Sequence, residues 1–150
     1  LRDLRFLEQW YRMGKAQNFF EFKEAMKLHA IPMFNTGYAD REGNIYYVYN
    51  AKIPKRDPRY NWKKILPGES NRALWYDYVP YDQLPQVFNP FEGFFQNCNS
   101  SPYLATGSKV DVTTALPDWT GIETHQTNRA LRSLETFGVD PSITREEFLI

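Results

Sequence analysis

The hydrophobic pattern at the start of the chain predicts two helices. Leu4, Leu7 and Tyr11 recur at helical spacing. Residues 19–29 repeat that spacing, and Asn18 stands before them as a natural N-cap. We therefore expect two consecutive helices over roughly the first 30 residues.

Two segments joined by a short connection that contains glycine then predict a β-hairpin over residues 33–53. The segments "MFNTGYAD" and "IYYVYNAKI" flank the short connection "REGN". Gly43 in that connection can take the positive φ that a tight turn requires.

The middle of the chain has no clear period. Residues 54–92 hold six of the ten prolines together with many Trp and Tyr residues, which predicts an ordered but irregular surface layer. We expect a strand over residues 93–99, where two aromatic side chains lead into polar ones, and a loop over residues 103–121.

Two helices are expected near the end of the chain. The first runs from about Thr124 to Phe137 and ends at Gly138, a residue type common just after helices. The second begins near the end of the sequence, with Ser142 or Thr144 as its N-cap.

Charge and cysteine content exclude several classes of function. Lys plus Arg equals Asp plus Glu, 18 each, so the chain lacks the basic excess typical of nucleic-acid binding. No apolar stretch approaches the roughly 20 residues of a membrane span. Cys98 is the only cysteine, and neither His29 nor His125 stands in a metal-ligand spacing, so we expect no metal and no cofactor. The chain begins in helical register without Met, and we expect it to be a fragment of a longer protein.

The stretch "GFFQNCNSSP" is the strongest candidate for chemistry. In a strand, Asn97 and Asn99 would share a face, with Cys98 on the other. An Asn amide aimed at a substrate carbonyl can stabilise the oxyanion of a tetrahedral intermediate. The alternative is that these side chains only brace backbone turns, as Asn commonly does. Cys98 is a weak candidate nucleophile, because a buried structural thiol is far more common.

Two arginines in the predicted helix at residues 124–137 differ in their surroundings. Arg132 has Glu135 three residues on, so ordinary pairing on the helix surface explains it. Arg129 has no such acidic partner and is freer to point elsewhere, although a solvated arginine remains the common case.

Three pieces of the chain resemble the penicillin acylase-type family of N-terminal-nucleophile hydrolases, which includes the acyl-homoserine lactone acylases. They are the hairpin "NTGYADREGNIYYVYNAKIPKR", the run "LPGES…LWYDYVPYDQLPQVFNPFEGFFQNCNSSP" and the helix with Asn128 and Arg129. Cys98 and Ser100 are more similar to the lactone-acylase branch. The resemblance covers nearly the whole chain and favours a fatty or aromatic acyl amide as substrate.

The resemblance implies a mechanism and roles for particular residues. Such enzymes are precursors that cleave themselves, and a Ser at the new N-terminus attacks an amide carbonyl while its α-amine takes the proton. Asn99 matches the family's side-chain oxyanion donor, and Arg129 matches the arginine held near that donor. Asn97 matches a neighbouring bracing residue. The nucleophile itself is expected upstream of residue 1.

The resemblance also implies the fold and partners. We expect an α+β fold, with residues 1–150 as part of one β-subunit domain in an αββα sandwich of antiparallel sheets covered by helices. The expected partners are an acyl amide substrate and an α subunit from the same precursor, and the expected location is periplasmic or secreted. The competing hypothesis is a non-catalytic module whose aromatic residues, 17% of the chain, line a groove for a glycan or peptide.

Overall fold

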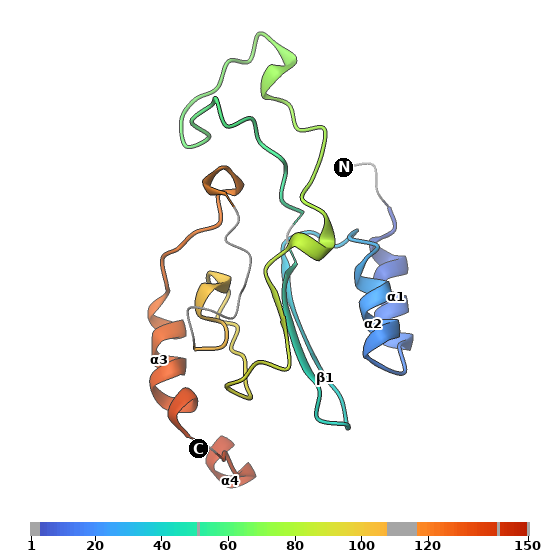
Figure 1. Cartoon of the computed structure of the whole chain (residues 1–150), viewed down its shortest axis with the longest axis vertical. Coiled ribbons are helices and arrows are strands. Elements are labelled where there is room, and N and C mark those ends of the chain that lie inside the picture. The colour runs from blue at the N-terminus through green and yellow to red at the C-terminus, as the bar shows by residue number, and fades with distance from the viewer. Residues whose placement is uncertain (1–3, 51, 108–116, 141, 150) are drawn as a thin grey trace.

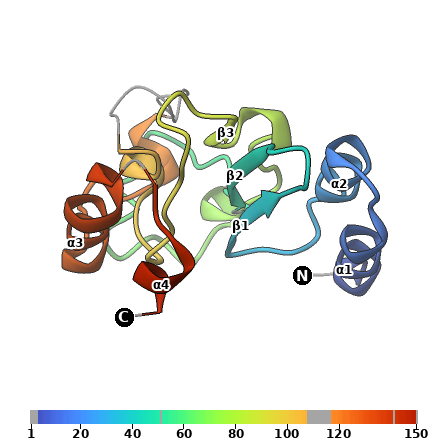
Figure 2. The same cartoon turned by 90° about the horizontal axis from the view of Figure 1, so that it is seen from below.

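A small antiparallel sheet lies at the centre of the molecule, with helices on both sides (Figures 1 and 2). This arrangement confirms the α+β class, while the second sheet of a four-layer sandwich stays a prediction. The computed structural model describes residues 4–50, 52–107, 117–140 and 142–149.

The predicted hairpin is confirmed. β1 (Phe34–Ala39) pairs antiparallel with β2 (Ile45–Asn50), and Asn35 stands opposite Tyr49. Gly43 has a φ of 86° in the connecting turn. A third strand, β3 (Gln86–Phe88), pairs with β2.

The Pro-rich segment 54–92 is therefore more than the surface layer that its sequence predicted. It supplies β3 and sends Val79, Tyr81 and Leu84 into the main core, where each is less than a tenth exposed. Proline removes backbone donors but does not prevent burial of the aliphatic and aromatic side chains between prolines. The core consists of Phe22, Met26, Tyr46, Val48, Ile53, Val79, Tyr81 and Leu84.

The two N-terminal helices are confirmed as α1 (Phe6–Lys15) and α2 (Phe19–Met26), and the Asn18 side chain caps α2. Most apolar side chains of α1 are exposed, however, with Leu7 67% exposed, while Met13 packs against the core. The buried residue of α1 is Gln9, whose Oε1 accepts hydrogen bonds from two backbone N–H groups just after α2.

The C-terminal helices are shorter than predicted. α3 (Asn128–Thr136) begins four residues later than expected, because Thr127 caps it by accepting a hydrogen bond from the Ala130 N–H. α4 (Arg145–Phe148) is capped by Thr144 and not by Ser142. Short 3-10 turns occur at Asn71–Ala73, Tyr81–Gln83, Pro102–Leu104, Asp118–Thr120 and Phe137–Val139.

The predicted strand at residues 93–99 is wrong, because this segment is irregular. Positive φ angles at both of its ends, 74° at Gly93 and 54° at Asn99, are incompatible with a strand. The segment is nevertheless held on the sheet. The Phe95 ring occupies the space beside Gly37 in β1, where a Cβ would lie 2.8 Å from it. The Gln96 N–H donates to the Ala105 carbonyl at 2.7 Å.

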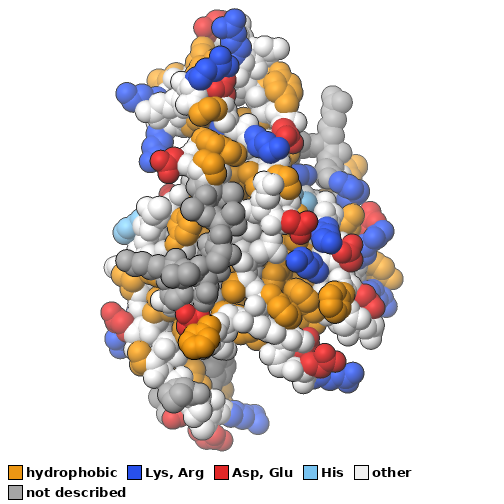
Figure 3. All heavy atoms as spheres, viewed as in Figure 1, with side chains coloured by type: hydrophobic (Ala, Val, Ile, Leu, Met, Phe, Trp, Pro, Cys, Tyr) orange, Lys and Arg blue, Asp and Glu red, His pale blue; other side chains and the backbone are white. Residues whose placement is uncertain are grey.

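Lys and Arg side chains are interspersed with Asp and Glu on the face shown in Figure 3, as the balanced composition predicts. No helix in the described part of the chain is both long and apolar enough to cross a membrane.

A buried pair of tyrosines predicts sensitivity to alkali. The hydroxyls of Tyr46 and Tyr81 lie 2.7 Å apart, and Tyr46 also donates to Gln86 Oε1 at 2.8 Å. Burial raises the pKa of Tyr46 from 10.0 to about 12, and the pKa of Tyr81 is also raised, chiefly by burial. Above pH ~10 the unfolded chain therefore loses protons that the folded chain keeps, and the free energy of unfolding falls.

We expect this decline between pH ~10 and about 12 to be shallower in a Tyr46→Phe variant, measured by denaturant unfolding at stepped pH. Tyr76→Phe is the matched control, because Tyr76 is 74% exposed. An equally steep decline in Tyr46→Phe and the wild type would show that Tyr46 is not the responsible group.

Candidate active site

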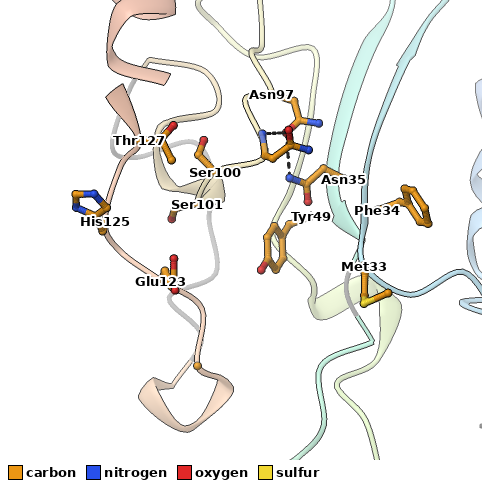
Figure 4. Close-up of a pocket in the computed structure, with 12 residues that line it drawn as sticks. Met33, Phe34, Asn35, Tyr49, Asn97, Ser100, Ser101, Glu123, His125 and Thr127 are labelled. Atoms are coloured by element: carbon orange, nitrogen blue, oxygen red, sulfur yellow. Dashed lines mark hydrogen bonds between the residues drawn. The ribbon is translucent and has the colours of Figure 1, made fainter. Parts of the chain in front are cut away.

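A cavity of about 460 Å³ opens between β1 and the extended segment that leads into α3. Figure 4 shows its walls. Met33, Phe34 and Asn35 form one side, Glu123, His125 and Thr127 form the opposite side, and Asn97 lies at one end. The remaining lining residues are Tyr49, Asn99, Ser100, Ser101 and Gly121.

Asn99 and Asn97 do lie together, but not through strand alternation as predicted. The Asn99 backbone N–H donates to Asn97 Oδ1 at 3.1 Å, which is a local side-chain turn. Asn99 has a φ of 54°, a left-handed conformation that Asn tolerates better than most residues. The turn places Asn99 in the lining of the cavity.

Arg129, in the first turn of α3, is brought to the same place. Its Nη2 donates to the Cys98 carbonyl at 2.8 Å and lies 3.5 Å from Asn99 Oδ1. An arginine can only donate hydrogen bonds, so the amide oxygen of Asn99 faces the guanidinium. The Asn99 Nδ2 therefore faces away from Arg129, and none of the described residues accepts a hydrogen bond from it.

Arg132 behaves as its spacing predicted. It pairs with Glu135 at 3.3 Å on the exposed face of α3. Arg129 is exposed, as a solvated arginine would be, and its guanidinium also binds the backbone of the segment that carries Asn99.

His125 lies in the extended segment before α3, where it lines the cavity. The predicted helix start at about Thr124 would have placed it in the first helical turn. Facing it across the cavity are neutral groups, among them Tyr49. The pKa of Tyr49 is raised, mainly by burial and further by the carboxylate of Glu123.

Cys98 is separated from the histidines. It lines a second cavity, of about 720 Å³, beside Phe94 and α3, and neither histidine lines that cavity. The structure therefore does not support a Cys–His pair. Within the described residues, no group of three His, Cys, Asp or Glu side chains could hold a metal ion.

Asn35 is the residue of this site that the sequence did not single out. Its Nδ2 donates to Asn97 Oδ1 at 3.0 Å, across 62 positions of sequence (Figure 4). No local spacing could reveal such a pair. The three asparagines and Arg129 form one connected set, at whose end the Asn99 amide nitrogen has no acceptor among the described residues.

Comparison with known proteins assigns the chain to a family. The sequence matches the family model for penicillin amidase over residues 2–149. It is 31% identical to the penicillin G acylase of Escherichia coli, with 67% of this chain and 12% of the relative aligned. It is 30% identical to the acyl-homoserine lactone acylase PvdQ of Pseudomonas fluorescens, with 67% of this chain and 15% of the relative aligned.

A solved structure gives the same result. The chain resembles the thermostable penicillin G acylase of Alcaligenes faecalis with a TM-score of 0.59 and 29% identity, over 75% of this chain and 20% of that one. The chain thus spans a fifth or less of the length of these relatives. Since the family model covers nearly every residue, the chain belongs to the penicillin amidase family.

Proposed function

We propose that this chain is an interior part of the β subunit of an amidohydrolase that cleaves acylated amines such as acyl-homoserine lactones or penicillins. The single observation that carries the proposal is the Asn99 amide, whose oxygen faces Arg129 and whose nitrogen is left to donate at the cavity edge. Family membership supports it, because the relatives named above are acylases.

In this proposal the nucleophile is an N-terminal serine located elsewhere in the full-length protein. Its hydroxyl attacks the amide carbonyl, and its own α-amine takes the proton. An α-amine has an ordinary pKa of about 7.7–8.0, which suits a base near neutral pH. Collapse of the tetrahedral intermediate expels the amine product, which takes the proton from the ammonium. Water then hydrolyses the acyl-enzyme.

Asn99 would act on the oxygen of that intermediate. A neutral amide donor held in place before reaction stabilises the developing oxyanion without reorganisation. Asn97 would brace the Asn99 backbone, and Arg129 would keep the amide turned the right way. The 150 residues alone would be inactive, since the proposal places the nucleophile outside them.

The same proposal implies an α subunit cut from a common precursor and a periplasmic or secreted location. One relative in Pseudomonas, 24% identical over 91% of this chain, is named penicillin acylase 2 proenzyme. The competing hypothesis of a groove-binding module is not favoured. Of the residues that line the cavity around Asn99, only Phe34 and Tyr49 are aromatic side chains of the type such a groove would use.

Substrate class can be tested with a panel of amides. The full-length protein would be incubated with phenylacetyl amides and with acyl-homoserine lactones of increasing chain length, and the released amine would be quantified. We expect release of amine from at least one series and no opening of the lactone ring. A processed protein that releases no amine from any member would contradict the proposed function.

A further inference from the structure

We propose that Asn35 is a positioning residue that sets the Asn99 oxyanion donor through Asn97. The inference rests on the proposed function and deepens it. Asn97 Oδ1 accepts two hydrogen bonds, one from the Asn99 N–H at 3.1 Å and one from Asn35 Nδ2 at 3.0 Å. Asn35 lies on β1, so the pair ties the irregular segment that carries Asn99 to the sheet (Figure 4).

The direction of this hydrogen-bond chain is fixed by its ends. The Asn99 backbone N–H can only donate, so Asn97 must turn its oxygen toward it. The same oxygen faces Asn35, so Asn35 must present its NH₂ group. With Arg129 fixing the Asn99 amide from the other side, each amide in the set has a single productive orientation.

Asn99 needs this support because its backbone is in a sparsely populated conformation. A φ of 54° persists when neighbouring groups hold it, and the Asn97 oxygen is the group that binds the Asn99 N–H. Without the Asn35 donor, Asn97 keeps one of its two bonds and can rotate. The Asn99 amide then loses its link to the rigid hairpin.

Asn35 also forms part of the cavity wall, next to Phe34. A substrate that presses on this wall therefore contacts the strand that positions the oxyanion donor. Binding and carbonyl polarisation would be linked through a single residue of β1.

Two variants of the full-length enzyme test the inference. Asn35→Leu removes the donor and keeps the shape, and we expect kcat to fall up to about tenfold with little change in KM, the loss of one ordinary hydrogen bond. Asn35→Asp keeps the shape but places a carboxylate against the Asn97 oxygen. Asn97 must then flip and present its NH₂ to the Asn99 N–H, so we expect a larger loss.

The pH dependence of Asn35→Asp separates positioning from a general structural role. When the introduced carboxyl group is protonated, its O–H can donate to Asn97 and rebuild the chain of bonds. The ratio of variant to wild-type kcat should therefore rise as pH falls toward about 4, the ordinary pKa of an aspartic acid side chain. Taking the ratio cancels the titration of the catalytic amine. This variant also keeps the test decisive if Asn35→Leu fails to mature.

The matched control is Asn44→Leu. Asn44 Oδ1 accepts from Asn89 Nδ2 at 3.0 Å, so Asn44 also takes part in a hydrogen bond between two asparagine side chains, at the turn end of the hairpin. We expect near-normal kcat in this control. Unaltered kcat in the Asn35 variants, or a ratio of Asn35→Asp to wild-type kcat that does not change with pH, would overturn this inference. The proposed function would stand in either case. A mature wild type that cleaves no amide would remove the proposed function, and this inference with it.

Discussion

Replacing Asn99 by glycine lowers kcat of the full-length enzyme by ~10²–10³ in our account, the usual cost of losing one oxyanion donor. Glycine is the sharper choice over alanine because residue 99 has a φ of 54°, which glycine adopts freely. The substitution therefore removes the amide without adding backbone strain. Single-turnover release of the amine product measures the effect on acyl transfer directly.

The controls for Asn99→Gly separate catalysis from folding. Precursor processing and the thermal midpoint of unfolding should stay close to those of the wild type. Asn99→Asp is the complementary variant, since it keeps the side-chain shape but turns the donor into a carboxylate that faces the developing negative charge. Near-normal turnover in Asn99→Gly would return Asn99 to the role of a turn-bracing residue.

Replacing Arg129 by alanine should lower kcat by about 10- to 100-fold, the range expected for a hydrogen bond made by a charged donor. Its Nη2 bonds to the Cys98 carbonyl at 2.8 Å and orients the Asn99 amide, so its loss frees both the backbone and the side chain of the donor. Steady-state kinetics on the mature enzyme would measure this decrease in kcat.

Arg132→Ala is the matched control for Arg129→Ala. Arg132 lies on the same helix, and it pairs only with Glu135 on the exposed face among the described residues. Such a surface pair contributes little to stability. We therefore expect Arg132→Ala to fold normally and to leave kcat unaltered. Arg129→Lys keeps the positive charge but not the planar guanidinium. Partial activity in this variant would show that the charge alone supplies part of the effect of Arg129. An unchanged rate in Arg129→Ala would make Arg129 a surface residue.

Local chemistry made part of the fold predictable. The hairpin followed from the two segments that flank the turn at Gly43, and both Asn18 and Thr144 cap helices as their positions predict. The prediction failed where distant contacts decide structure. β3 has only three residues and lies in a Pro-rich segment. Residues 93–99, which begin with two aromatic side chains after Gly93, pack on the sheet without pairing as a strand.

The candidate site shows the same division. Its polar residues, Asn97 and Asn99, stood out in the sequence, but the predicted geometry was wrong because they meet through a turn and not across a strand face. Arg129 was predicted to lie near these asparagines only because of the resemblance to a family. Asn35 could not be found at all, since its partner lies 62 positions away.

The most direct test of the central claim is the intact mass and N-terminal sequence of the full-length gene product. We predict two chains, with the larger one beginning at Ser and containing these 150 residues. That result would establish the free α-amine on which the proposed mechanism depends. A single uncleaved chain, inert towards amides, would contradict the account and leave Asn99 as a residue that braces a turn.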